Sequence, residues 1–243
     1  KNHSLAKSSP SQIALIFDYD ADAAWKIQPH GRNLNYFTLV FETYRAIRKL
    51  GQSIDILPSS QEDFCNYKII FAPGLIYMNE KLKQALSNFK GQVFLGPRTS
   101  TRDKNLNTPI PLPPNLPNFD SKIVLTESFR SDDPIALEKG GYFCNYREKL
   151  EGNAEVVELT VNGDPAILRD GNFTYIAGWL DSTALKRIVL SALESAEMDF
   201  IDLPTGVRVR TNSKERFWFN YSGKLRKTPV KTLRSGEFFI EQF

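Results

Sequence analysis

The acidic residues that follow the first apolar run are the first candidates for chemistry in this sequence. Asp18, Asp20 and Asp22 come directly after the run of residues 13–17 and alternate along the chain. Clustered carboxylates can bind Mg²⁺ or Ca²⁺, but a calcium loop also needs a glycine at its sixth position and a glutamate at its twelfth, and both are missing here. Three acids repel a pyrophosphate, and no G-x-G-x-x-G follows the run. We therefore expect neither a metal nor a nucleotide cofactor at this position.

Nucleophilic catalysis lacks a suitable residue. The two cysteines, Cys65 and Cys144, form no C-x-x-C pair and have no zinc-like spacing. In class I glutamine amidotransferase-like sheets the nucleophile sits on a sharp turn after a strand, and the comparable turn here, residues 72–77, has no Cys, Ser or Thr. His3 lies in a polar terminal segment, so only His30 could serve as a base. We predict that this chain carries no catalytic residue.

Three tryptophans could instead form stacking platforms for sugar rings. Trp179 follows a β-like run and Trp218 lies in the run Phe-Trp-Phe, so both are expected in the core. Trp25 lies in a polar stretch beside His30 and is the one tryptophan that we expect to be exposed or interfacial. A carbohydrate-binding module that uses Trp25 or the C-terminal segment of the chain therefore remains as an alternative function, and an amidotransferase-like hydrolase as a less favoured one.

The first hundred residues alternate between apolar runs and amphipathic stretches. This alternation predicts a doubly wound, mostly parallel α/β sheet with helices on both faces. The expected strands are residues 13–17, 54–57, 68–72 and 92–95, and the expected helices are residues 33–50 and 79–89.

The rest of the chain predicts more strands and one helix. Five prolines between positions 109 and 117 indicate an extended surface segment, after which the sheet is expected to resume at residues 123–126. Asn-Gly and Asp-Gly turns between residues 155 and 177 predict an antiparallel extension, and residues 182–197 predict a helix. Short strands after Gly206 predict a small antiparallel β domain.

Composition and charge exclude several classes of protein. The chain has 243 residues, 41% hydrophobic and 24% charged, and no apolar run reaches the roughly 18 residues of a membrane helix. The net charge is +3, and residues 203–243 carry nine basic and three acidic side chains. These charges alternate with apolar residues as on the outer face of strands, so we expect neither a nucleic acid nor a membrane as partner.

Several segments, in their order along the chain, resemble the trimerisation domain of glycoside hydrolase family 42 β-galactosidases. They are FDYDADAAW at residues 17–25, IQPHG at 27–31, YKIIFAP at 67–73, GPRT at 96–99, GDPA at 163–166, LPTGV at 203–207 and FNY at 219–221. The likeness runs from about Ile13 to the C-terminus. One departure is Ser100, which stands where the family has a glycine after Gly-Pro-Arg-Thr.

The resemblance implies an amidotransferase-like, flavodoxin-like α/β domain that has lost its nucleophile. We expect residues 1–12 to be disordered or tag-like, residues 13–202 to form the trimerisation domain and residues 203–243 the small β domain. In the family, the catalytic TIM barrel with its two glutamates would lie before Lys1, so this chain is expected to be a non-catalytic part of an enzyme that hydrolyses terminal β-D-galactosides.

The expected partners are two further copies of the chain and the barrel of the parent protein, and the expected compartment is the bacterial cytoplasm. We predict that Tyr19, Trp25, His30 and Arg32 contact a neighbouring subunit or a sugar, because aromatic and arginine side chains are favoured interface anchors.

Overall fold

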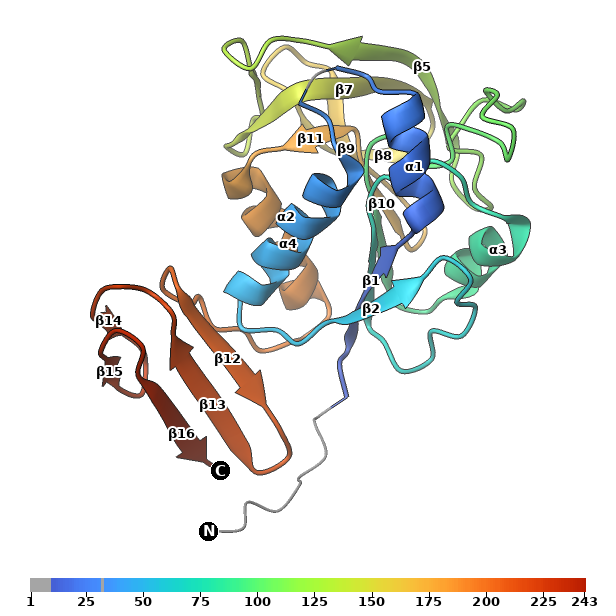
Figure 1. Cartoon of the computed structure of the whole chain (residues 1–243). Helices are drawn as coiled ribbons and strands as arrows, with labels where there is room; N and C mark the ends of the chain where they lie inside the picture. Colours follow the sequence, from blue (N-terminus) through green and yellow to red (C-terminus); the bar gives the residue numbers. More distant parts are fainter. Residues whose placement is uncertain (1–9, 32) are drawn as a thin grey trace.

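A central sheet of seven strands organises the protein (Figure 1). The structure is a computed structural model and describes residues 10–31 and 33–243. The order across the sheet is β2 (Asp55–Pro58), β1 (Ile13–Phe17), β3 (Ile69–Ala72), β4 (Gln92–Leu95), β10 (Phe173–Ile176), β9 (Pro165–Asp170) and β8 (Glu155–Leu159). The first four pairings are parallel and the last two antiparallel, which confirms the expected mixed α/β sheet with an antiparallel extension.

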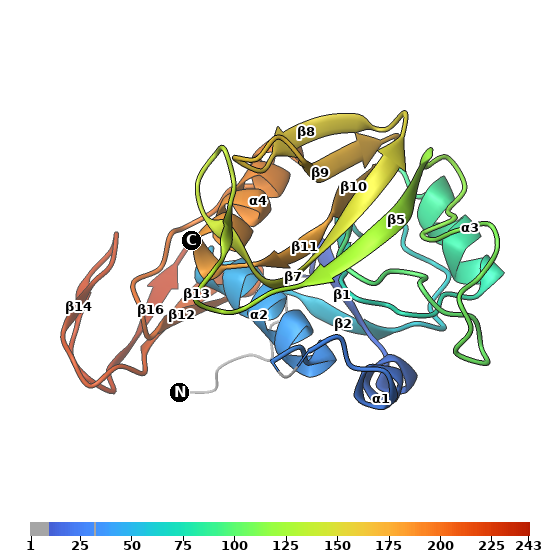
Figure 2. The same ribbon diagram turned by 90° about the horizontal axis from the view of Figure 1, so that it is seen from above.

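Helices lie on both faces of this sheet, as expected. α2 (Tyr36–Lys49) and α4 (Ser182–Ser195) lie on one side, and α3 (Glu80–Asn88) lies on the other (Figure 2). Each helix begins at a side chain that accepts hydrogen bonds from the first turn, supplied by Asn35, Asn79 or Asp181. The apolar faces of α2 and α4 are buried and contact each other.

A helix that the sequence did not predict follows β1 directly. α1 spans Tyr19–Ile27, where the polar residues indicated a loop. Asp18 is its N-cap, and its carboxylate accepts hydrogen bonds from the backbone N–H of Asp20 at 2.7 Å and of Ala21 at 3.2 Å. The acidic residues therefore stabilise a helix N-terminus, where carboxylates interact favourably with the exposed N–H groups.

A second sheet covers one end of the first, near α1 (Figure 1). It contains β11 (Gly178–Leu180), β7 (Tyr142–Gly152) and β5 (Ser121–Ser128), with β6 (Ile135–Ala136) paired to β7. The expectation that residues 123–126 return to the main sheet is therefore wrong. Their partner is the long strand β7, which has mixed polar and apolar residues and no simple alternation.

The C-terminal segment forms two small sheets with their own apolar cluster. β12 (Val207–Thr211), β13 (Glu215–Asn220) and β16 (Phe238–Gln242) form one sheet, and β14 (Arg226–Lys227) pairs with β15 (Thr232–Leu233). The buried side chains of this cluster are Leu203, Val207, Val209, Trp218 and Leu233.

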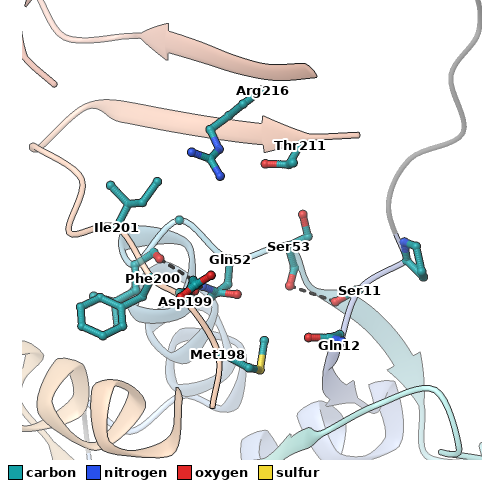
Figure 3. Close-up of a pocket in the computed structure, with 13 residues that line it drawn as sticks. Ser11, Gln12, Gln52, Ser53, Met198, Asp199, Phe200, Ile201, Thr211 and Arg216 are labelled. Carbon is teal, nitrogen blue, oxygen red and sulfur yellow. Dashed lines mark hydrogen bonds between the residues drawn. The ribbon is translucent and has the colours of Figure 1, made fainter. Parts of the chain in front are cut away.

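The C-terminal unit is hydrogen-bonded to the end of α2. Arg48 donates from Nη2 to the carbonyl oxygen of Val209 at 2.8 Å, and Leu203 N–H donates to Lys49 O at 2.9 Å. A pocket of about 410 Å³ lies beside this junction, lined by residues of both parts of the chain (Figure 3). Gln52 crosses it and donates from Nε2 to Asp199 O at 2.7 Å.

The predicted disorder of residues 1–12 is wrong at its last positions. Residues 1–9 lie outside the described part, but Ser11 is buried, and its hydroxyl donates to Ser53 O at 2.9 Å. The ordered chain therefore begins before Ile13. Within the residues that the structure describes, no helix is long and apolar enough to cross a bilayer.

Candidate functional site

Gly74 lies in the turn directly after β3, at the carboxyl ends of the parallel strands. Gly74 has a φ of +67°, a conformation that side chains disfavour. A Cβ atom added to Gly74 would lie 2.9 Å from Cδ2 of Leu39 and 3.0 Å from Cζ2 of Trp25. Neighbouring side chains thus fill the space that a cysteine or serine would need.

Trp25 is buried, so the expectation that it is exposed or interfacial is wrong. Only 2% of its surface is exposed. Its indole N–H donates to the carbonyl oxygen of Gly74 at 2.9 Å, and the guanidinium carbon of Arg98 lies 4.3 Å from its ring centre. Trp25 is therefore a packing residue at the strand ends and has no free face for a sugar or a partner.

Arg98 completes the other side of this stack. It follows β4, has a φ of +68° and is 1% exposed. Its Nη2 donates to Gln28 O at 2.7 Å, whereas Nε and Nη1 have no hydrogen-bond partner among the described residues. Burial lowers the pKa of this guanidinium to about 10, still well above neutral pH, so the side chain carries its charge. In the sequence, Arg98 is marked only as one residue of the Gly-Pro-Arg-Thr segment, and no local signal indicates this role.

Glu148 of β7 ties the second sheet to the same place. Its Oε1 accepts hydrogen bonds from Arg98 N–H at 2.8 Å and from the Tyr146 hydroxyl at 2.9 Å, and its Oε2 accepts one from Tyr175 at 2.7 Å. Burial raises the pKa of Glu148, while these three donors oppose the rise. We refer to Trp25, Gly74, Arg98 and Glu148 together as the strand-end centre.

The turn that contains Arg98 has a second residue with positive φ. Ser100 has a φ of +53°, and its hydroxyl is buried without a hydrogen-bond partner among the described residues. This is the position where the sequence departs from its resemblance. A glycine would adopt this conformation without strain and would leave no hydroxyl to desolvate.

His30 lies beside the strand-end centre in a pocket of about 370 Å³. Burial, and then the charges of Arg98 and Arg102, lower the pKa of His30 to about 4, so the ring is neutral at pH 7. The lining residues include both arginines and no acidic residue. We call this cavity the arginine pocket. Its outer wall is apolar, and includes the half-exposed side chains of Leu112 and Leu125.

Tyr19 is the most exposed of the three predicted contact residues that the structure describes. It stands in the first turn of α1 with 82% of its surface exposed, at the edge of an open groove of about 620 Å³. Exposed Phe37, Phe41 and Ile56 also line this groove. We call Tyr19, Asp20 and these three residues the α1 face. The fourth predicted contact residue, Arg32, lies outside the described residues.

The surroundings of both cysteines raise the pKa of the thiol. Cys65 is exposed on a loop, and burial raises the pKa of Cys144 to about 11, which leaves little thiolate at pH 7. Within the described residues, no group of three His, Cys, Asp or Glu side chains could hold a metal ion.

All three tryptophans are buried. Trp179 donates from Nε1 to Glu42 at 3.0 Å, and Trp218 donates to Glu241 at 3.0 Å. The expectation that these two lie in the core is confirmed. With Trp25 also buried, no tryptophan presents an open platform for a sugar ring.

Comparison with known proteins identifies the relatives of this chain. Residues 11–199 match the family model of the β-galactosidase trimerisation domain. The chain is 29% identical over 229 residues to a β-galactosidase of Thermus thermophilus, covering 90% of this chain and 34% of that protein. It is 26% identical to the β-galactosidase Bga of Halorubrum lacusprofundi, covering 89% of this chain and 35% of the relative. The chain thus spans about a third of the length of these curated relatives.

Solved structures of β-galactosidases have the same fold as this chain. The crystal structure of a β-galactosidase from the psychrophilic Marinomonas ef1 superposes with a TM-score of 0.87 at 27% identity, covering 96% of this chain and 38% of that one. A β-galactosidase from Halorubrum lacusprofundi has the same fold, with a TM-score of 0.88 at 21% identity, covering 98% of this chain and 40% of that one.

Proposed function

The chain belongs to the family of β-galactosidase trimerisation domains, and from this premise we propose that it holds three copies of its parent protein together and performs no chemistry itself. The strand-end centre is the observation that supports the proposed lack of catalysis. Gly74 occupies the position of a nucleophile, and Trp25 fills the space in front of it. Covalent catalysis needs a nucleophile with a positioned base, and this turn offers neither.

The finer classification of the fold is part of this proposal. We assign residues 13–202 to an amidotransferase-like α/β domain, with Ser11 added at its start, and residues 203–243 to a separate small β domain. The positive φ of Gly74 directly after β3 supports the first assignment, because a nucleophile elbow has this backbone shape. The separate apolar cluster of the C-terminal sheets supports the second.

The activity of the parent protein follows from its relatives. Since the chain spans about a third of proteins named β-galactosidase, we propose that the remainder of the parent carries a catalytic barrel and hydrolyses terminal β-D-galactosides. The alternative of a carbohydrate-binding module loses Trp25 as its stacking platform, because that side chain is buried, and keeps only the small β domain as a candidate surface.

Light scattering on the 243-residue chain over a range of concentrations tests the proposal. We expect the mass to rise towards three times the 27.6 kDa of one chain. A chain that remains monomeric at the highest concentration would contradict self-assembly. Titration with galactose or lactose, followed by tryptophan fluorescence, is the companion measurement, and a saturable response at millimolar sugar would favour the binding module instead.

A further inference from the structure

The first turn of α1 carries an acidic residue that nothing in the described part of the chain neutralises. Asp18 caps the helix, and Asp22 pairs with Lys26 at 2.6 Å. Asp20 lies between them, is exposed and forms no ion pair with any described residue. Beside it, Tyr19 projects into solvent at 82% exposure. This end of α1 therefore presents an aromatic ring next to a free carboxylate.

The arginine pocket has the opposite character. Arg98 and Arg102 both line it, and neither forms an ion pair with a described residue, although ten such pairs occur elsewhere in the described chain. Arg102 is held in place, since its Nε donates to Gln28 Oε1 at 2.5 Å and its Nη1 to Thr101 O at 2.7 Å. Its Nη2 has no partner among the described residues. The carboxylate of Glu148 lies beside Arg98 and raises the pKa of its guanidinium against the larger effect of burial, whereas Arg102 has no acidic partner among the described residues. A partly buried guanidinium without a carboxylate partner favours an anionic group beside Arg102.

Exposed apolar side chains surround both the Tyr19–Asp20 end of α1 and the arginine pocket. Exposed Phe37, Phe41 and Ile56 lie near Tyr19, and Leu112 and Leu125 form the outer wall of the arginine pocket. Exposed apolar surface next to a few charged groups is typical of protein interfaces, where aromatic and arginine side chains contribute most of the binding energy.

A ring of three identical chains requires two different contact surfaces on each chain, because a three-fold axis gives only heterologous contacts. The α1 face and the arginine pocket are two such surfaces, one acidic and one basic. They lie at opposite ends of α1, whose nine residues span about 14 Å.

We propose that Tyr19 and Asp20 of one copy enter the arginine pocket of the next copy, where the Asp20 carboxylate pairs with Arg102. The inference rests on the proposed assembly function and names the surfaces that perform it. His30 lines the same pocket and is neutral at pH 7 because burial and the two arginines lower its pKa to about 4. The tyrosine hydroxyl thus meets an uncharged ring that can donate or accept a hydrogen bond.

Charge reversal at both ends of the proposed pair is the test, with association measured by sedimentation equilibrium. Asp20→Arg and Arg102→Glu are each expected to raise the dissociation constant at least about tenfold. The double variant restores an opposite pair and should return to within about threefold of the wild type. Asp132→Arg and Lys227→Glu make the same charge changes on exposed positions elsewhere and should leave association unchanged.

A mixing experiment tests the heterologous geometry. Tyr19→Ala loses the first surface and keeps the second, whereas Arg102→Glu does the reverse. Each alone should be monomeric at a concentration where the wild type is trimeric, and their equimolar mixture should form dimers, since one intact contact remains. A mixture that stays monomeric would contradict the proposed pairing.

The remaining outcomes separate this inference from the proposed function. A wild-type chain that never associates contradicts assembly by this chain, and the inference with it. A wild-type trimer that is unaffected by Asp20→Arg contradicts the inference alone, because this exposed substitution leaves the Asp18 cap of α1 in place. A double variant that fails to recover also contradicts the inference, provided that its circular dichroism spectrum matches that of the wild type.

Discussion

The strand-end centre and the α1 face lie at the two ends of the same short helix and have opposite properties. In the centre, Trp25 is 2% exposed, Glu148 accepts three hydrogen bonds, and added atoms at Gly74 would collide with side chains. At the α1 face, Tyr19 is exposed and Asp20 has no charged partner among the described residues.

This contrast indicates how the protein divides stability and binding. The place where an α/β sheet ordinarily binds a ligand, outside the carboxyl ends of its strands, is packed shut in this chain. Tyr19 and Asp20 lie about one helix length away on an exposed surface, whereas the unpartnered guanidinium atoms of Arg98 lie in the centre itself, on the side of the arginine pocket. Substitutions in the centre should therefore change folding and leave surface chemistry alone, and substitutions at the α1 face should do the reverse.

The largest loss of folding stability is expected from Glu148→Ala. The variant leaves the Arg98 N–H and the hydroxyls of Tyr146 and Tyr175 buried without an acceptor, which should lower the free energy of unfolding by about 3–5 kcal/mol. Urea denaturation measures this loss. Glu148→Gln keeps an acceptor at Oε1 and should cost clearly less; equal losses in the two variants would mean that the hydrogen bonds do not anchor the second sheet.

Gly74→Ala is expected to cause the second-largest loss in the free energy of unfolding. A Cβ atom at a φ of +67° is strained and overlaps Leu39 and Trp25, so we expect a loss of about 2–4 kcal/mol. Gly163 is a matched control, because it has a φ of +84° with open space around the added atom. Gly163→Ala should show the strain alone. If thermal or urea unfolding finds both variants equally stable, the centre is not closed in the way described.

Ser100→Gly should stabilise the protein. It relieves the positive φ and removes a buried hydroxyl without a described partner, and the gain should be about 1 kcal/mol after the added flexibility of the unfolded chain. Thr99→Gly, the neighbouring control, removes the hydrogen bond from the Thr99 hydroxyl to Gly96 O at 2.6 Å and should destabilise. A Ser100→Gly variant with a lower melting temperature would show that the hydroxyl contributes something that the structure does not reveal.

The smallest predicted effect is the contribution of His30 to the pH dependence of folding stability. The pKa of His30 is lowered from 6.5 to about 4 in the folded protein, mainly by burial. Unfolded chains therefore bind more protons between these values, and stability is lost as the pH falls below about 6.5. From pH 7 to pH 5, the free energy of unfolding should fall by roughly 1 kcal/mol more in the wild type than in His30→Gln, once partial exposure is allowed for. Parallel pH profiles of the two proteins would contradict this environment for His30.

Much of the fold could be predicted from the sequence because its signals are local. The apolar strands β1, β3 and β4 have continuous hydrophobic runs, and α2, α3 and α4 have both a periodic apolar face and a capping residue. The order of short motifs also led to the correct family.

The parts that were missed depend on partners distant in the sequence. α1 has only nine residues, and the three aspartates at its start, the cap Asp18 and the helical Asp20 and Asp22, are also typical of a turn. β7 buries Arg147 and Glu148 on its two opposite faces, and polar residues with remote hydrogen-bond partners leave no hydrophobic period to detect. Trp25 was expected to be exposed because the polar segment Gln28-Pro-His30 follows it, whereas Gly74 and Arg98, which bury it, lie dozens of residues away.

The most direct test of assembly through the α1 face is the solution mass of the wild-type chain beside that of Tyr19→Ala, measured by sedimentation at the same concentration. We predict a wild-type mass of three times 27.6 kDa and a variant mass of one chain, with unchanged thermal stability in the variant. A variant that assembles like the wild type would contradict the role of the α1 face, and a wild type that sediments as a single chain would contradict assembly by this chain altogether.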